Sequence, residues 1–544
     1  MSRSSRESAH TRALSRGWDA EVPALGDVSG PVFPLWAALL IAAGAGPVLD
    51  AGFPDKGYWP LTFVGIALVL VTLIGRRAGS AFLVGFVAGM AFYLTQIEWA
   101  SLFLGPLPMT ALSFLESLFF GLGASAIALA YRWVPRAFPT RFGRWILLPI
   151  VVAGLWTARE AWASVWPYGG FAWGRVALSQ SDSPFSPLFA WIGISGLSFV
   201  MVLIAATSLS VVRLALHPRP PRLSEGDTMR PALLRAALVP VAIAAIALVL
   251  PAFPVITDGS LRVAAVQGSG KAGYFDQRAP GDLLQAQLSA TAPLFGQHVD
   301  VVLWPEGATD YSPLDDPYTA QVFDYVSQQL HAPLVGWAVT QRGDKSYNTE
   351  LLWDHGAVVD YYDKKHPVPF GEYVPDRAFW EPFAPDLIGL IGRDYTPGTT
   401  DNVFNINGVI AGVNICFDIV DDQILTESVQ EGAQVIFASS NNADFGHTDE
   451  SAQQLSIARI RAMELGRSVV NISTVGLSAV IAPDGKIVQQ LPWYTAATMV
   501  QDVQLSTVTT PAVVIGRDLE WFVSGLGLSI LLISGFALRR PRRA

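Results

Sequence analysis

The stretch VIAGVNICFD at residues 409–418 is an apolar run that ends in a cysteine, an aromatic ring and a carboxylate. A short, continuous apolar run predicts a strand that is buried on both faces. Cys416 is the only cysteine among the 544 residues, so no intrachain disulfide can form. A lone cysteine is most often a small buried hydrophobe. Whether Cys416 is instead a nucleophile depends on the sequence around it.

Further strand-like segments lie on both sides of this run, and helix-like segments alternate with them. The strand-like segments are 261–268, 299–307, 332–340, 348–354, 357–365, 433–443 and 468–488, of which the last predicts two or three strands. Residues 281–296 and 449–466 have helical patterns. Apolar strands mixed with helices predict an α/β sandwich in which the sheets are covered.

The rest of the chain is more apolar than a soluble domain. Charged residues make up 15% of the sequence and the mean hydropathy is +0.37, whereas soluble domains have about 25% charged residues. A helix that spans a membrane needs about 20 mostly apolar residues. Segments of this kind predict a helical bundle of about eight spans, near 32–50, 59–76, 79–97, 109–131, 145–163, 186–214, 232–254 and 519–538.

Basic residues occupy the two tails and every second connection between these segments. They are Arg3, Arg6, Arg12, Arg16, Arg76, Arg77, Arg132, Arg136, Arg141, Arg144, Arg213, Arg219, Arg222, Arg230, Arg539, Arg540, Arg542 and Arg543. Because basic connections stay in the cytoplasm, we expect both termini there and residues 256–517 outside the cell membrane. That stretch has 14 Lys and Arg against 31 Asp and Glu, a net charge of −17. The acidic balance argues against a nucleic-acid partner.

This pattern divides the chain into five parts. Residues 1–31 form a cytoplasmic tail, and residues 32–255 form a membrane domain of seven spans. Residues 256–517 form the outer, catalytic domain, and residues 518–538 form the eighth span. Residues 539–544 form a basic cytoplasmic tail. We expect a multi-pass membrane protein whose α/β domain lies on the extracytoplasmic side.

Three groups with acid–base or nucleophilic chemistry lie where apolar strands end. They are Glu306 in LWPEG, Lys364 in YYDKKHPVPFGE and Cys416 in NICFD. Cysteine reacts as the thiolate, so it needs a proton acceptor or a nearby cation. A carboxylate in a partly apolar pocket can accept that proton, and a fixed ammonium can stabilise the oxyanion of a tetrahedral intermediate. The three groups together predict acyl transfer through Cys416.

Each group also has an ordinary structural interpretation. Glu306 alone fits a solvated strand end, and Lys364 beside Lys365 fits a surface pair. His366 offers a Cys–His pair, although a hydrogen-bonded structural histidine is the favoured interpretation. No histidine has a metal-ligand spacing with Cys416, so we expect no metal.

The order Glu–Lys–Cys in these contexts resembles the carbon–nitrogen hydrolase, or nitrilase, superfamily. The motifs are WPE, K-x-H-x-V-P-F-G-E and a strand that ends in C-F-D. An α/β domain inserted between a seventh and an eighth span narrows the resemblance to the apolipoprotein N-acyltransferases, of an actinobacterial type. WPYGGFAWGRVALSQSD at 166–182, NNADFG at 441–446 and QQLSIARIRAMELGRSVV at 453–470 extend the resemblance over nearly the whole chain. It implies a nitrilase-like αββα sandwich.

The resemblance implies a role for each matching residue. Glu306 matches the general base, Lys364 the lysine that stabilises the oxyanion, and Cys416 the acylated nucleophile. Glu372 matches a supporting glutamate that orients the lysine or assists the base. Phe417 and Asp418 fall where the family usually has Tyr and Glu, so the ring and the charge are kept but the hydroxyl is lost. We therefore expect that hydroxyl to be replaceable.

Other departures concern the residues expected to contact substrate. The family often has Trp where this sequence has Asp444, before Phe445. A family Trp in the loop after the first strand is also missing, and Tyr274 or Phe275 is expected to stand in for it. Asn441 and Asn442 fit a pocket lining and a turn equally well.

The implied reaction moves a fatty acyl chain from a membrane phospholipid to the α-amino group of a diacylglyceryl-cysteine in an apolipoprotein, through a thioester on Cys416. It needs no cofactor, and we expect a monomer. One alternative is a membrane-anchored amidase or nitrilase that hydrolyses small amides, for which a single anchor would suffice. Another is a transporter or scaffold with a degenerate α/β domain, against which the retained Glu306, Lys364 and Cys416 argue.

Two groups of charges outside these motifs also need an interpretation. Arg159 and Glu160 lie near the outer end of the fifth segment, where they fit an ion pair or a substrate entrance. The ion pair is the preferred interpretation. Arg459, Arg461 and Glu464 are expected on a partly solvated helix face with an internal ion pair.

Overall fold

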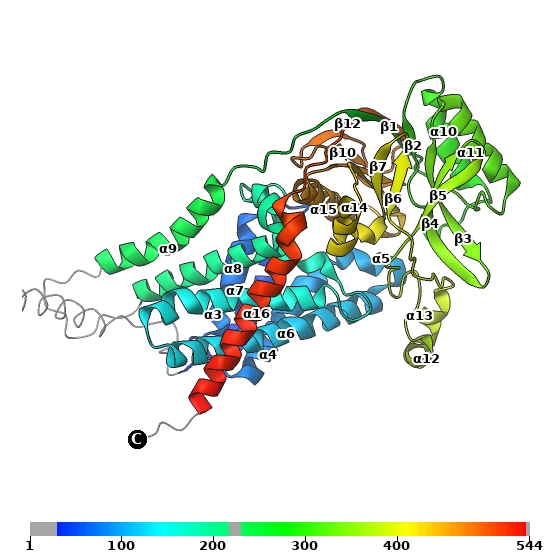
Figure 1. The fold of residues 1–544 in the computed structure, drawn as a ribbon. Helices are drawn as coiled ribbons and strands as arrows, with labels where there is room; N and C mark the ends of the chain where they lie inside the picture. The colour runs from blue at the N-terminus through cyan, green and yellow to red at the C-terminus, as the bar shows by residue number, and fades with distance from the viewer. Residues whose placement is uncertain (1–29, 217–229, 540–544) are drawn as a thin grey trace, which may run out of the picture.

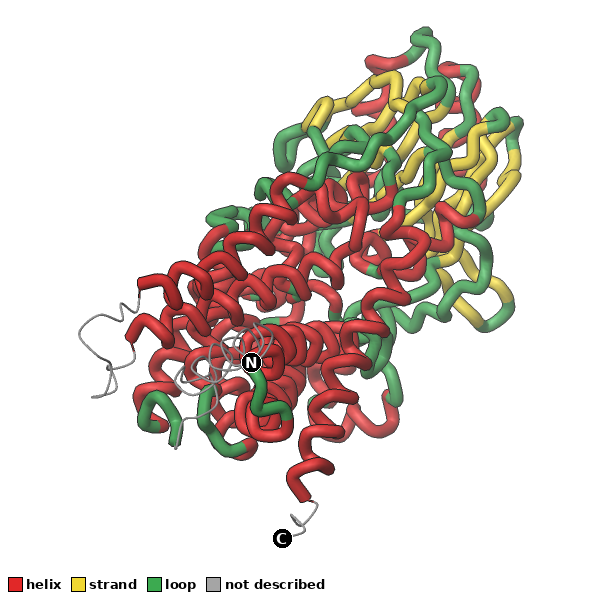
Figure 2. Tube along the Cα trace, turned by 60° about the vertical axis from the view of Figure 1, so that its left-hand side comes forward, coloured by secondary structure: helices red, strands yellow, loops and turns green. Residues whose placement is uncertain are grey.

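The computed structural model describes residues 30–216 and 230–539. They form a bundle of helices and a two-sheet domain at one end of it (Figure 1). Figure 2 shows the same division, with the strands confined to the two-sheet domain. The predicted combination of an apolar helical bundle with an α/β sandwich is therefore confirmed.

An apolar helix occupies each of the eight predicted segments. These helices are α2 (Leu35–Asp50), α3 (Pro60–Leu73), α4 (Ala78–Gln96), α6 (Pro106–Ala137), α7 (Leu148–Ala163), α8 (Phe189–Leu216), α9 (Arg230–Val249) and α16 (Pro511–Arg539). Among the described residues, five helical stretches are long and apolar enough to cross a membrane: Ala78–Gln96, Pro106–Ala137, Gly143–Ala163, Ser186–Leu216 and Pro511–Arg539. The helices α2 and α3 and the apolar part of α9, Ala236–Val249, are shorter, so the number of spans stays a prediction.

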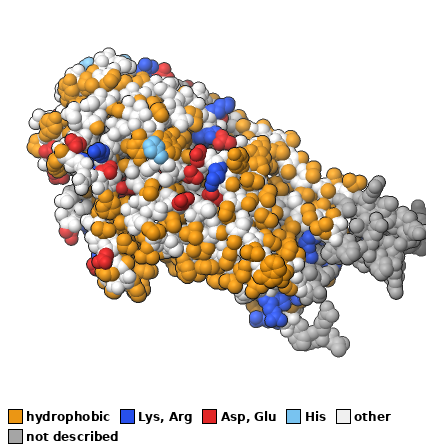
Figure 3. Space-filling view, turned by 180° about the vertical axis from the view of Figure 1, so that it is seen from behind, with side chains coloured by type: hydrophobic (Ala, Val, Ile, Leu, Met, Phe, Trp, Pro, Cys, Tyr) orange, Lys and Arg blue, Asp and Glu red, His pale blue; other side chains and the backbone are white. Residues whose placement is uncertain are grey.

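Small residues let the helices of the bundle approach one another closely. Gly154 of α7 faces Gly527 of α16, and a Cβ at Gly154 would overlap the carbonyl oxygen of Val523. A Cβ at Gly85 of α4 would likewise overlap Ala124 of α6. Such contacts are typical of helices that pack in lipid, where backbone proximity replaces the hydrophobic effect between helices. Figure 3 shows hydrophobic side chains gathered over the bundle, with charged side chains where it meets the other domain.

The other domain contains two six-stranded sheets. The first has the order β12-β1-β2-β3-β4-β5, formed by Ala497–Gln504, Ser260–Gln267, Val301–Leu303, Leu334–Arg342, Lys345–Asp354 and Ala357–Asp363. The second has the order β11-β10-β9-β8-β7-β6, formed by Ile487–Gln490, Ala479–Ile481, Ser468–Ser473, Val435–Ser440, Val409–Ile415 and Val403–Ile406. The predicted strand at 409–418 is β7, which lies between β6 and β8.

Helices cover the outer face of each sheet. The two sheets face each other through a shared apolar core that includes Leu303, Val413 and Phe437. The helices α10 (Asp282–Thr291) and α11 (Pro317–Leu330) pack on the first sheet. The helices α14 (Asp422–Gln430) and α15 (Asp449–Leu465) pack on the second sheet and join the apolar core of the bundle. The layers are therefore helix, sheet, sheet, helix, and then the bundle.

Buried hydrogen bonds and ion pairs fix the domain on the bundle. The indole nitrogens of Trp99 and Trp173 both donate to Oε1 of Gln453 in α15, at 3.1 and 2.7 Å. Arg175 contacts both carboxylate oxygens of Asp422, at 2.6 and 2.9 Å. These contacts hold the base of the domain against the helices.

The two predicted charge groups both contain ion pairs. Arg159 and Glu160 lie 3.2 Å apart and are buried. Arg461 pairs with Glu464 as expected. The expected partly solvated face is wrong for these two residues, which are 1% and 9% exposed. The physical reason is that this face of α15 packs against α8 rather than facing water.

Candidate active site

Four strand ends meet at one edge of the sandwich. Glu306 follows β2, Lys364 follows β5, Cys416 follows β7 and Asn441 follows β8. The two strands β7 and β8 are parallel, so their carboxyl ends lie side by side. The backbone N–H of Asn441 donates to Oε2 of Glu306 at 3.0 Å, which joins the two sheets at this edge.

Cys416 lies at a sharp turn of the backbone. It is the first residue after β7 and has a φ of 52°, in the left-handed region that residues other than glycine rarely adopt. Asp418 closes the turn, because its Oδ2 accepts hydrogen bonds from the N–H of Ile415 at 3.1 Å and from the hydroxyl of Tyr362 at 2.9 Å. Strained backbone of this kind is concentrated at functional sites.

One amide connects the two glutamates and the lysine. Nδ2 of Asn348, in β4, donates to Oε1 of Glu306 at 2.9 Å and to Oε1 of Glu372 at 2.5 Å. Oε2 of Glu372 accepts from Nζ of Lys364 at 2.9 Å and from the N–H of Val368 at 2.6 Å. All four polar side chains of this network are buried. The arrangement fixes an ammonium and a carboxylate in a small space where water has little access.

The electrostatics of the site favour a neutral thiol beside a permanent cation. Burial raises the pKa of the Glu306 carboxyl, although the ammonium of Lys364 opposes the rise. Burial, and then the charge of Glu306, raises the pKa of the Cys416 thiol well above its usual value. Burial alone would lower the pKa of Lys364, but the negative charges of Glu372 and of a Cys416 thiolate raise it. The thiol therefore reacts only if a base accepts its proton as the new bond forms.

Asn348 is a site residue that the sequence analysis missed. It lies in the middle of a strand-like segment, where a polar residue is usually assigned to the solvent face. No local sequence pattern indicates it, because its place beside Lys364 depends on strand pairing, in which the backbone carbonyl of Asn348 accepts the N–H of Lys364 at 2.9 Å. This pairing places the side chain of Asn348 next to the lysine and its glutamate partner.

Glu350 is a second buried acid in the same strand. It is two residues from Asn348 and fully buried, and neither of its oxygens accepts a hydrogen bond of good geometry from the described residues. Burial raises its pKa to about 8, while the Ser439 side chain lowers it and the charge of Glu306 raises it further. Glu350 therefore holds a proton at neutral pH.

Aromatic side chains from both domains surround the cysteine turn. The ring of Phe417 is stacked between Phe171 and Trp173, with centroid distances of 5.9 and 5.8 Å. Phe445 meets the ring of Trp99 edge to face at 4.9 Å. Tyr274 contacts the ring of Phe103 at 5.8 Å. The bundle thus supplies part of the apolar wall around the site.

The other expected site residues have partners within the domain. The amide of Asn441 donates to the carbonyl of Ala272 at 2.9 Å. The amide of Asn442 donates to Glu450 and Gln454, at 2.7 and 2.6 Å. Nδ1 of His366 lies 3.0 Å from Asp421, and this hydrogen bond raises the pKa of the imidazole. Burial raises the pKa of Asp418 to about 6, although the charge of Lys364 opposes the rise.

Two family models match the chain. Residues 45–207 match the apolipoprotein N-acyltransferase N-terminal domain, and residues 262–511 match the carbon–nitrogen hydrolase family. The first match covers most of the bundle and the second covers the two-sheet domain. Together they correspond to the two parts of the structure.

Named relatives match the chain over most of its length. An apolipoprotein N-acyltransferase of Mycolicibacterium smegmatis is 31% identical, over 93% of this chain and 87% of its own length. One of Vibrio parahaemolyticus is 25% identical, over 90% of this chain and 96% of its own length. A CN-hydrolase superfamily protein of Xanthomonas campestris is 19% identical with a TM-score of 0.35, over 48% of this chain and 95% of its own. The predicted family is confirmed: this chain belongs to the apolipoprotein N-acyltransferases, enzymes of lipoprotein maturation.

Proposed function

We propose that this enzyme transfers a fatty acyl chain from a membrane phospholipid to the α-amino group of a diacylglyceryl-cysteine at a lipoprotein N-terminus, through a thioester on Cys416. One observation carries the proposal. A carboxylate, an ammonium and a thiol each follow a strand at the same edge of the sandwich, and Asn348 joins Glu306 to the Glu372–Lys364 pair. These are the groups that thioester chemistry needs.

The first half-reaction acylates Cys416. Glu306 takes the proton from the Cys416 thiol, and the sulfur attacks an ester carbonyl of the phospholipid. The ammonium of Lys364, with backbone N–H groups near Phe417, stabilises the oxyanion that forms. When the tetrahedral intermediate collapses, the lyso-phospholipid oxygen leaves and takes the proton from Glu306. The products are a lyso-phospholipid and an acylated enzyme.

The second half-reaction transfers the acyl group from Cys416 to the lipoprotein. The amino group of the lipoprotein attacks the thioester, and Glu306 accepts a proton from the nitrogen. The thiolate of Cys416 leaves and regains that proton, so an amide is formed and the free enzyme returns. The buried network around Lys364 keeps bulk water away from the thioester, which favours attack by the amine over hydrolysis.

The membrane arrangement follows from the charges of the bundle. We propose that the helices cross the cytoplasmic membrane several times, with the two-sheet domain outside. Arg77 precedes α4, whereas the opposite end of α4, at Gln96, contacts Gln453 of the two-sheet domain. Arg539 ends α16, whereas Thr510, just before α16, contacts Glu464 of that domain. Basic residues favour the cytoplasmic face, which leaves the catalytic domain on the opposite face. Both lipid substrates can then diffuse laterally to the site.

A membrane-anchored amidase is the less supported alternative. It needs the same Glu306, Lys364 and Cys416, but it would hydrolyse small amides without lipid. The relatives named apolipoprotein N-acyltransferase match the chain over both of its parts, and an amidase would not need the bundle.

Intact mass spectrometry of the full chain tests the proposal. Wild-type protein incubated with a phospholipid of one acyl chain type should gain one acyl group, and hydroxylamine should remove it. The Cys416→Ser and Glu306→Gln variants should gain none. The matched control is Glu381→Gln, which changes an exposed glutamate remote from the strand ends and should be acylated like wild type. Turnover of small amides, with no acyl group on the wild type, would favour the amidase.

A further inference from the structure

A large cleft lies between the helices of the bundle and the underside of the catalytic domain. Its volume is about 1050 Å³, at the upper end of the roughly 300–1,000 Å³ of small-molecule sites. Its apolar walls include Leu122 and Ala126 of α6, Leu155 and Trp162 of α7, and Trp521 and Leu528 of α16. On the side of the catalytic domain, Asp421 and Asp422 line the cleft at the start of α14.

The cleft is long enough for an acyl chain. Its lining on α16 runs from Ala512 to Leu528. Sixteen residues of helix rise about 24 Å, which is most of the roughly 30 Å hydrocarbon core of a membrane. An acyl chain of one leaflet, which spans about half of that core, can therefore lie along α16 within the cleft.

The polar end of the cleft contains an arginine without an acidic partner. Nη1 of Arg517 donates to the amide oxygen of Gln423 at 3.0 Å, and no ion pair joins Arg517 to a carboxylate of the described residues. The other arginines of the lining are paired, Arg159 with Glu160 and Arg461 with Asp422 and Glu464. Arg517 is thus available to a phosphate.

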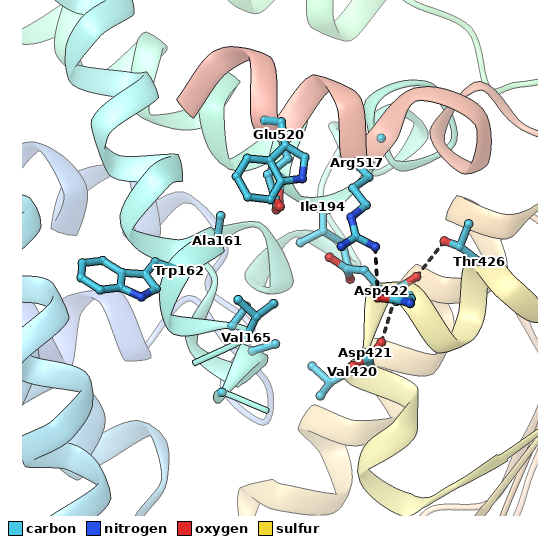
Figure 4. A pocket seen from close by; sticks show the side chains of 18 of the residues that line it. Ala161, Trp162, Val165, Ile194, Val420, Asp421, Asp422, Thr426, Arg517 and Glu520 are labelled. Atoms are coloured by element: carbon cyan, nitrogen blue, oxygen red, sulfur yellow. Dashed lines mark hydrogen bonds between the residues drawn. The ribbon is translucent and has the colours of Figure 1, made fainter. Parts of the chain in front are cut away.

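Acidic side chains stand on both sides of Arg517. Figure 4 shows Arg517 and Glu520 reaching into the cleft from α16, with Asp422 at the start of α14 beside them and Val165, just after α7, opposite. Asp518 also lines the cleft. The carboxylates would repel a phosphate that carries no positive charge of its own. A head group that carries an ammonium as well as a phosphate would satisfy both charges.

The cleft reaches the turn that holds the sulfur but not the sulfur itself. Phe417 and Asp418 line the cleft, whereas Cys416 does not. The ring of Phe417 also packs on Phe171 and Trp173. The nucleophile is therefore outside the lining of the cleft.

From these features we infer that the cleft is a second lipid site, distinct from the site of acyl transfer. It binds one zwitterionic phospholipid of the phosphoethanolamine type. The phosphate lies on Arg517, the ammonium lies beside Asp518 and Glu520, and one acyl chain lies between α6, α7 and α16. This lipid is retained and not consumed, and it fills the space between the catalytic domain and the bundle.

Native mass spectrometry of the full chain, titrated with dioleoyl phosphatidylethanolamine or dioleoyl phosphatidylglycerol, tests this site. Gly525 lies in the cleft, and a Cβ there would meet open space, so Gly525→Phe should fill the cleft without a clash. Gly44 of α2 has the same open surrounding outside the cleft, so Gly44→Phe is the matched control. Arg517→Gln removes the cation. Each measurement is made in wild-type and Cys416→Ser protein, so that a failure of acyl transfer leaves the binding result intact.

We expect one tightly bound phosphatidylethanolamine in wild type, Cys416→Ser and Gly44→Phe, and none in Gly525→Phe. A lost charge-assisted contact costs about 1.5–3 kcal/mol, so Arg517→Gln should weaken binding about tenfold or more. Phosphatidylglycerol should bind more weakly than phosphatidylethanolamine. Equal binding by Gly525→Phe, or equal binding of the two lipids, would overturn the inference. Conversion of the retained lipid to its lyso form in wild type only would make the cleft the donor site instead.

Discussion

Replacing Asn348 by Leu should shift the pH dependence of catalysis and leave the fold in place. The substitution keeps the approximate size of the side chain and removes the hydrogen bonds to Glu306 and Glu372. The hydrogen bond from Asn348 is one of the contacts that lower the pKa of Glu306 against the effect of burial. Without it, the carboxyl should hold its proton to higher pH.

The magnitude follows from the strength of that contact. A hydrogen bond to a charged group contributes about 1.5–3 kcal/mol, and one pKa unit corresponds to about 1.4 kcal/mol. Losing that contact should therefore raise the pKa of Glu306. A general base acts only when ionised, so activity below the new pKa should fall about 10- to 100-fold. The loss should shrink as the pH rises through that pKa.

Initial rates of acyl-enzyme formation between pH 5 and pH 9 measure the shift. Asn405→Leu is the matched control, because Asn405 is exposed in β6 and should give the wild-type profile. Near-ultraviolet circular dichroism checks the fold of both variants. A rate that falls by one constant factor at every pH would refute the reasoning, since it would assign Asn348 a structural role only. An unchanged rate would remove Asn348 from the site.

Three further predictions concern groups around the site. Glu350 keeps its proton to about pH 8 in the folded protein but to only about 4.5 when unfolded, so wild type should lose up to about 1.4 kcal/mol of stability per pH unit between these values. Glu350→Gln should remove that loss, seen as a melting temperature that depends less on pH. Arg461→Met should destabilise the protein by about 3–5 kcal/mol, because it leaves the buried carboxylate of Glu464 unpaired, and thermal melting in detergent measures this. His366→Gln should change the acylation rate less than about threefold, because its ion pair is half-exposed and such pairs contribute about 0–1 kcal/mol.

Hydropathy and strand patterns predicted much of the fold. The eight apolar segments were long enough to predict helices. The strand at 409–418 could be predicted because burial on both faces leaves a continuous apolar run. The sequence analysis did not identify α11, α14, β6 or β12. The two helices are amphipathic and short, and the pattern of Ala497–Gln504 is mixed, because β12 is an edge strand with one partner.

The chemistry of the site could be predicted only in part. Glu306, Lys364 and Cys416 each follow an apolar strand, and a reactive group at a strand end is visible in the sequence. Asn348 and Glu350 lie inside a strand, so their importance depends on the pairing of β4 with β5 and on the facing sheet. Pairing is a tertiary property, and no local pattern specifies it.

The contacts of Phe417 explain why the bundle belongs to the catalytic centre. An anchored amidase would need a membrane segment only as a tether, and its nucleophile would be held entirely by its own domain. Here Trp173, from the connection between α7 and α8, stacks on the residue that follows the nucleophile. The same indole donates to Gln453, whose neighbour Gln454 donates to the carbonyl of Cys416 at 3.4 Å. Residues of both domains therefore hold the turn that presents the thiol. A substitution in the bundle should alter the rate of acyl transfer as well as the access of lipid to the site.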